Sequence, residues 1–309
     1  MFCSTVIPTI GRSTLSRAVC SILDQSLESD DFEVIVVNDS GRPLPQADWQ
    51  QSRRVRIINT NQCNRSVARN AGAATARGKF LHFLDDDDWV LPDTLRMFWA
   101  LGRTSDAGWL YGASQLVDSN GRLFNELHLG MSGNVLAQVM AGEWIPLQAS
   151  LIKSEVFFAA GGFDPLMPVG QDKDLCARVA AFSSFASTPT TVASILRGVG
   201  WETSTDYARS RESGYQSREK LLSRPGILSR MRSSASSSYW HGRILRVYLI
   251  SALWNLRRKT ILTAMSRATF GAASFVLAGR QVLSPDFWRA LTTPHVSRTR
   301  TPHDRVKTS

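Results

Sequence analysis

Short apolar runs and helical patterns alternate along the first third of the chain. Runs with the length of strands lie at residues 4–8, 32–37, 55–58 and 79–84. Between them, apolar residues recur on one face at 15–23 behind an N-capping Ser13, and small residues fill 66–76. This alternation predicts an α/β fold, with a mostly parallel central sheet and helices on both of its faces.

Weaker patterns follow in the rest of the chain. A further strand is expected at 109–111, and a glycine-containing loop from Gly161 leads into a helix at 172–181. Two helices that alternate apolar and basic residues are expected at 239–256 and 259–279. We therefore predict four parts, which are a catalytic domain at 1–222, a serine-rich linker at 223–238, a helical region at 239–294 and a disordered basic tail at 295–309.

Charge separates the two ends of this 309-residue chain. Residues 1–196 hold 16 Lys and Arg against 20 Asp and Glu, whereas residues 197–309 hold 20 against 6. The first part has the balance of an ordinary enzyme, and the second is suited to an anionic partner. The hydrophobic share of 43% allows a sizeable core and excludes a disordered or fibrous protein.

The cysteines and apolar runs indicate a cytoplasmic protein. Cys3, Cys20, Cys63 and Cys176 form no zinc-type spacing, so we expect reduced thiols. The first apolar run is too short for a signal peptide, and no uninterrupted apolar run approaches the roughly 18 residues of a membrane span.

Polar residues follow three of the predicted strands and should meet at one sheet edge. They are Thr9, Asp39 and the acidic run 85–88. Four adjacent carboxylates repel one another unless a cation lies among them, and oxygen ligands of this kind suit Mg²⁺ or Mn²⁺. The alternatives are a solvated acidic turn for the run and a turn aspartate before Gly41 for Asp39.

Two further groups are candidates for the same site. Arg69 could reach a phosphate or brace the acidic run, or it could be a surface arginine. Asp172 follows Gln171 at the start of a predicted helix, where the helix dipole favours an ionised carboxylate and hence a general base. A plain N-cap is the alternative for Asp172, and a structural ion pair is the alternative for Asp174.

Five segments resemble glycosyltransferase family 2 when taken together. They are residues 6–9, 34–40, 69–72, 84–89 and 161–174, in the order that the family has. The resemblance covers roughly residues 3–205, and it implies a GT-A nucleotide-binding fold and a metal-dependent transfer with inversion at the anomeric carbon.

The resemblance implies roles for individual residues. Donor-binding residues would be Pro8, Thr9, Asp39, Arg69, Asn70, Asp85 and Asp86. Asp87 would be the metal ligand for Mg²⁺ or Mn²⁺, and Asp172 the catalytic base. Gln171 stands where the family has Glu. Gln171, Asp174, Arg197 or the stretch 201–205 would contact the acceptor or the diphosphate.

The function that follows is transfer of a sugar from a nucleotide-diphosphate sugar, with UDP-sugars first. The acceptor would be a hydroxyl of a saccharide, a lipid-linked saccharide or a small molecule, as in bacterial polysaccharide and cell-envelope biosynthesis. A non-catalytic nucleotide-sugar-binding protein and a nucleotidyltransferase remain as alternatives. The nucleotidyltransferase usually needs a glycine-rich loop near the first strand, where residues 8–12 have one glycine.

The basic C-terminal residues lie outside the resemblance. Arg243, Arg246, Arg257 and their neighbours alternate with aromatic and aliphatic residues, which is typical of helices on an anionic membrane. A helical subdomain packed on the catalytic domain is equally compatible. The absence of a recognisable nucleic-acid motif argues against a nucleic-acid partner. The expected location is the cytoplasm or the inner face of the cytoplasmic membrane.

Overall fold

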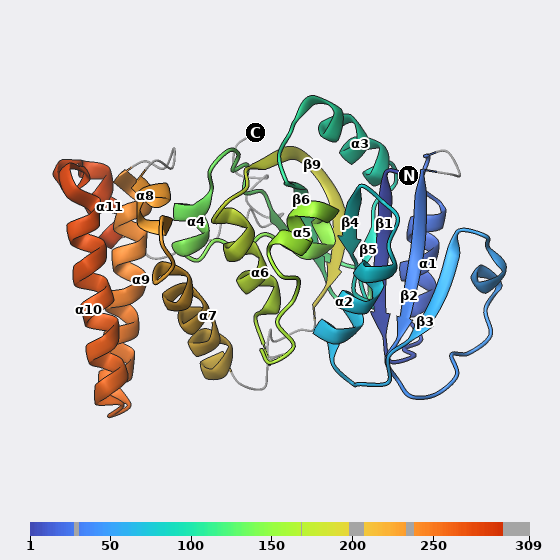
Figure 1. The fold of residues 1–309 in the computed structure, drawn as a ribbon, viewed down its shortest axis with the longest axis horizontal. Coiled ribbons are helices and arrows are strands. Elements are labelled where there is room, and N and C mark those ends of the chain that lie inside the picture. The colour runs from blue at the N-terminus through green and yellow to red at the C-terminus, as the bar shows by residue number, and fades with distance from the viewer. Residues whose placement is uncertain (28–30, 168, 198–206, 233–237, 293–309) are drawn as a thin grey trace.

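A nine-stranded sheet runs through the computed structural model, which describes residues 1–27, 31–167, 169–197, 207–232 and 238–292 (Figure 1). The strands are β1 Cys3–Thr9, β2 Phe32–Asn38, β3 Val55–Asn59, β4 Phe80–Phe83, β5 Trp89–Val90, β6 Trp109–Val117, β7 Leu123–Leu127, β8 Ser150–Lys153 and β9 Phe185–Leu196. Their order is β3-β2-β1-β4-β8-β6-β9-β5, and β7 pairs with β6.

The sheet is parallel in its first half and mixed in its second. Strands β3, β2, β1 and β4 are all parallel. Strand β8 is antiparallel to both β4 and β6, while β6 and β9 are parallel to each other. The predicted α/β fold is confirmed, and the antiparallel strands add a mixed half that the chain pattern did not reveal.

Helices cover both faces of the sheet. They are α1 Leu15–Leu23, α2 Arg65–Thr75, α3 Thr94–Thr104, α4 Leu136–Met140, α5 Ser154–Ala159, α6 Gln171–Ala180, α7 Tyr207–Leu222, α8 Ile227–Arg232, α9 Ser238–Arg257, α10 Ile261–Ala278 and α11 Pro285–Thr292, with 3-10 turns at Asp48–Gln51, Leu147–Ala149 and Gly279–Leu283. One hydrophobic cluster contains α1 and α3, and another contains α2, α5 and α6. The two clusters lie on opposite faces because side chains alternate along each strand.

Glycine lets α2 approach the sheet closely. A Cβ at Gly72 would clash with Val6 and would lie 3.0 Å from Cγ2 of Val37. The helix therefore needs a residue without a side chain at this point, and its position places Arg69, which precedes Gly72 in α2, beside Asp85 at the carboxyl end of β4.

The C-terminal helices pack against the same core. Ile244 and Tyr248 of α9 belong to the hydrophobic cluster that includes residues of β4 and β6. The segment predicted as a linker differs from that prediction, because it contains α8, whose Ile227 and Met231 are buried in this cluster. Apolar positions at helical spacing explain the difference. The division into domains stays a prediction.

Among the residues that the structure describes, one helix is long and apolar enough to cross a membrane. It covers Ile261–Leu283, and it meets this criterion by length and composition alone. The sequence predicted no such segment because that prediction considered only uninterrupted apolar runs. Arg267 and Arg280 interrupt the apolar run of this helix.

Candidate active site

The carboxyl ends of β1, β2 and β4 meet at one edge of the sheet. Parallel pairing aligns Thr9 with Asn38, and the Asp39 amide donates to the Thr9 carbonyl over 2.8 Å. The Thr9 hydroxyl donates to Oδ2 of Asp86 over 2.6 Å. The structure therefore brings together the residues that the sequence placed after these three strands.

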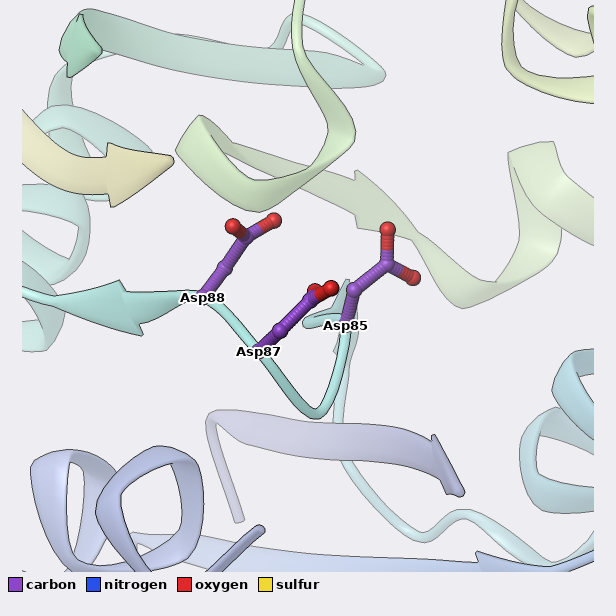
Figure 2. Close-up of side chains that lie close together, drawn as sticks. All are labelled: Asp85, Asp87 and Asp88. Carbon is purple, nitrogen blue, oxygen red and sulfur yellow. The ribbon is translucent and has the colours of Figure 1, made fainter. Parts of the chain in front are cut away.

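The acidic run forms the turn between β4 and β5. Figure 2 shows Asp85, Asp87 and Asp88 projecting from this turn to the same side. One carboxylate oxygen from each lies within 4.8 Å of the others. Asp86 faces β1 instead, where Thr9 and Arg12 contact its two oxygens. Three of the four carboxylates thus form one oxygen cluster.

Asp85 is the carboxylate that basic side chains stabilise. Burial alone would raise its pKa, but the Arg69 guanidinium that pairs with Oδ1, together with Arg65 and Arg197, holds the pKa below its usual value. Gln148 donates to the other oxygen, Oδ2, over 3.0 Å. Asp85 is therefore charged and held by donors on both oxygens.

Asp88 is the buried carboxylate of the cluster that has an oxygen without a hydrogen-bond partner in the part of the chain that the structure describes. It is fully buried, and burial with the charges of Asp85 and Asp87 raises its pKa well above the usual value. Its Oδ1 accepts from the Leu196 amide over 2.7 Å, while Oδ2 is buried with no hydrogen-bond partner among the described residues. An orphaned carboxylate oxygen beside two others is a donor set that fits a hard divalent cation.

Burial also raises the pKa of Asp87, and the neighbouring Asp85 charge adds to the effect. Arg12 opposes it by pairing with Oδ2 of Asp87 at 2.7 Å. Arg17 donates to the Asp87 carbonyl over 2.8 Å and lies 3.9 Å above the Trp89 ring. Arg12 and Arg17 are site residues that sequence reasoning missed, although their position just after β1 was a usable signal.

Asp39 holds the loop that precedes α2. Its Oδ1 accepts from the Thr60 hydroxyl over 2.8 Å and from the Gln62 amide over 2.6 Å. Its Oδ2 accepts from the Asn64 amide over 2.6 Å. The carboxylate therefore shapes the sheet edge, and its predicted nucleoside contact stays a prediction.

Arg69 and Asn70 are neighbours on α2 with different partners. Arg69 pairs with Asp85 and lies 5.2 Å from the centre of the Phe163 ring. Asn70 both donates to the Phe163 carbonyl over 2.8 Å and accepts from its amide over 2.9 Å. Gly162 has φ +65°, and a Cβ there would lie 2.8 Å from the Asn70 oxygen, so glycine is required. Asn70 therefore fixes the loop that leads to α6.

Asp172 lies in the first turn of α6 and is half-buried. The indole N–H of Trp144 donates to its Oδ2 over 2.7 Å. The guanidinium of Arg197 lies 5.9 Å from the Trp144 ring centre, and Arg197 also acts electrostatically on Asp85 and Asp88. Trp144 was missed because it is 28 residues from Asp172 and no motif marks it.

The residues beside Asp172 have structural partners. Gln171 is buried and donates to the Met167 carbonyl over 2.9 Å. Asp174 pairs with Arg178 at 2.6 Å and accepts from Ser217 on α7, which matches the structural alternative weighed for it. The stretch 201–205 lies outside the described residues.

The comparisons define the class of protein that this sheet and site belong to. Residues 4–150 match the family model described as "Glycosyl transferase family 2". The described residues have the GT-A fold found in glycosyltransferases. The family match covers just under half of the 309-residue chain, and over these residues the sequence resembles glycosyltransferase family 2, the family that its motifs predicted.

Relatives agree in class and are distant in sequence. An uncharacterized glycosyltransferase of Haemophilus influenzae is 26% identical over 192 residues, which cover 59% of this chain and 63% of that protein. The poly(ribitol-phosphate) beta-N-acetylglucosaminyltransferase TarP of Staphylococcus aureus is 28% identical over 115 residues, 35% of each chain. The chain thus matches less than two thirds of the length of either relative.

A solved structure supports the fold. The S. aureus TarS fragment 1–349, crystallised in complex with UDP-GlcNAc, aligns with a TM-score of 0.60 at 14% identity. The alignment covers 86% of this chain and 90% of that one.

Proposed function

We propose that this protein transfers one sugar from a UDP-sugar to an acceptor hydroxyl, with inversion at the anomeric carbon. The observation that carries the proposal is a half-buried carboxylate, Asp172, held on one oxygen by Trp144. The acidic cluster and the end of β1 supply a second, nucleotide-facing part of the same site. A UDP-sugar is the first donor to test because the TarS fragment was crystallised with UDP-GlcNAc.

The oxygen cluster is the proposed metal site. Asp87, with Asp85 and Asp88, would hold Mg²⁺ or Mn²⁺, and the buried unpartnered oxygen of Asp88 supports this. A bound ion would supply positive charge beside the donor diphosphate. Arg12 and Arg197 add fixed positive charge near the cluster whether or not the ion is bound.

Asp172 is the proposed general base. Trp144 engages its Oδ2, so Oδ1 is the oxygen that would take the proton from the acceptor hydroxyl. The acceptor oxygen then forms a bond to the anomeric carbon, and the bond to the diphosphate breaks with its electron pair on the leaving nucleotide. One displacement of this kind inverts the anomeric configuration and needs no covalent enzyme intermediate.

The other predicted residues would position this chemistry. Thr9 and Asp39, beside Pro8, shape the edge that would receive the nucleoside, and Arg69 fixes Asp85. Asn70 would act indirectly, through the loop that carries α6. We also propose a cytoplasmic location, which the four free cysteines support.

A donor screen tests the proposal. The purified protein is incubated with UDP-GlcNAc, other UDP-sugars, dTDP-sugars and GDP-sugars, with Mn²⁺ or Mg²⁺ and with an EDTA control, and released nucleotide diphosphate is measured. We expect slow hydrolysis of a UDP-sugar that EDTA abolishes.

Other outcomes would favour the alternatives. Release of pyrophosphate from a nucleoside triphosphate and a sugar phosphate would indicate a nucleotidyltransferase. Tight nucleotide binding without turnover of any donor would indicate a binding protein, and turnover that EDTA leaves unchanged would contradict the metal role of Asp87.

A further inference from the structure

The ends of α9 and α10 that meet at their connecting turn expose large apolar side chains to solvent. We define the hairpin tip as residues 253–265. Leu262 is 84% exposed, Met265 62% and Leu253 59%, and Leu256 and Ile261 are also exposed. These side chains come from the last turns of α9 and the first turns of α10, so they form one apolar end rather than scattered residues.

The same tip is basic. Arg257, Arg258 and Lys259 are exposed and connect the two helices, and no acidic residue lies within the tip. Across residues 238–292 there are eight Lys and Arg and one acid, Asp286. Exposed leucines next to basic side chains complement the apolar interior and the anionic headgroups of a lipid leaflet.

The tip points to the same side of the molecule as the candidate site. In Figure 1, β1 and β2 run downward, so their carboxyl ends lie at the lower edge, where α6 also begins. Helix α9 runs downward at the far end from β3, and its turn into α10 lies at that lower edge too. A flat surface that touches the tip would therefore run beneath the site.

The buried face of α10 argues for shallow insertion rather than a full span. Arg267 is 2% exposed, pairs with Glu219 of α7 and stacks over the Tyr215 ring at 4.7 Å. Gly271 lies against Tyr248 of α9, with a Cβ position 3.6 Å from the Tyr248 Cβ. Because crossing a bilayer would break this buried ion pair, the helix keeps its place in the protein.

We propose that the hairpin tip inserts into the interface of an anionic membrane, and that the sugar acceptor is a lipid-linked molecule held in that membrane. The acceptor class rests on the proposed function, whereas membrane binding does not. Insertion would hold the candidate site close to the membrane surface. The hydroxyl of a membrane-anchored acceptor would then lie near the site.

Vesicle binding tests the proposal. Full-length protein is sedimented with phosphatidylcholine vesicles that contain either no phosphatidylglycerol or an equal part of it. We expect binding only with phosphatidylglycerol. Leu253→Ser with Leu262→Ser should weaken it by about tenfold or more, and Arg257→Gln with Lys259→Gln should weaken it by a similar factor. Val276→Ser, a 74% exposed position near the other end of α10, is the matched control and should bind like wild type.

Separate readouts distinguish the possible failures. Each variant is also assayed for donor hydrolysis in solution, which should stay at the wild-type rate, and for mass by light scattering. Equal binding by wild type and the Leu253/Leu262 variant would overturn the proposal, as would a dimer that this variant dissociates. Protein that resists carbonate extraction would instead indicate a spanning helix. Binding that persists while lipid-linked acceptors go unused and water-soluble ones are used would overturn the acceptor class alone.

Discussion

At the scale of single residues, hydrogen bonding distinguishes the carboxylate proposed as the general base from the carboxylates with structural partners. Both carboxylate oxygens of Asp39 and of Asp174 have protein partners. In Asp172, the Trp144 indole donates to one carboxylate oxygen, Oδ2. The sequence predicted the position of all three aspartates, at the end of a strand or at the start of a helix. It did not predict which groups their carboxylates contact. Trp144 and Gln148 reach the site across 28 and 63 residues of chain, and no local pattern encodes such a contact.

Trp144→Phe tests the role of the indole donor. The change keeps an aromatic ring beside Arg197 and removes the hydrogen bond to Asp172. A hydrogen bond to a charged group contributes about 1.5–3 kcal/mol, so kcat should fall by about tenfold or more with little change in donor affinity. Steady-state kinetics measure this, and Trp99→Phe, at an exposed tryptophan of α3, is the control. An unchanged kcat would remove Trp144 from the mechanism.

His82 should make stability depend on pH. Burial lowers the pKa of its imidazole from 6.5 to about 4, although the hydrogen bond between the ring and the Gln148 carbonyl partly opposes this shift. The unfolded chain therefore binds the proton first as pH falls, and stability is lost between about pH 6.5 and pH 4. At pH 4.5 the loss should be about 2.5 kcal/mol relative to pH 7.

Urea unfolding of wild type and His82→Asn at pH 7 and pH 4.5 measures this contribution. The variant should lose less stability than wild type between the two pH values. Equal losses in the two proteins would show that His82 does not titrate in this way.

At the scale of elements, close packing of α2 on the sheet positions Arg69 and Asn70. Gly72→Ala should therefore destabilise the fold by about 1–3 kcal/mol, because the new methyl group would overlap Val6. Gly214→Ala is the matched change in another helix, α7, where no described heavy atom lies within 4 Å of the new Cβ. It should stabilise by up to about 1 kcal/mol. Thermal unfolding of both variants gives the signs, and two changes of the same sign would contradict this packing argument.

The elements were easiest to predict where local pattern and tertiary role agree. The apolar run at Phe32–Asn38 is buried along its whole length, so its residues alone indicated a central strand. Strand β8 is four residues long and pairs antiparallel with two strands distant in the chain, and nothing local marks it. Helix α8 was hidden by serine composition, although Ile227 and Met231 at helical spacing were the signal for it.

At the scale of the whole molecule, the candidate active site and the proposed membrane-binding tip lie at two different ends. The acidic cluster lies at the sheet edge, and the exposed basic residues of the hairpin tip lie at the far end of the same side (Figure 1). The fold itself persists at 14% identity to the TarS fragment, which shows how little of the sequence it requires. Sequence motifs were sufficient for the class because they mark the sheet edge, and they carry no information on the acceptor.

The most direct test of the central claim is the turnover of Asp172→Asn beside its binding of UDP. Asparagine keeps the size and the Trp144 hydrogen bond but cannot accept the proton, and Asp106→Asn at an exposed aspartate is the control. The account predicts that Asp172→Asn loses about a hundredfold or more in kcat while its UDP affinity stays within about twofold of wild type. Turnover equal to that of the control would contradict a glycosyltransferase mechanism with Asp172 as its base.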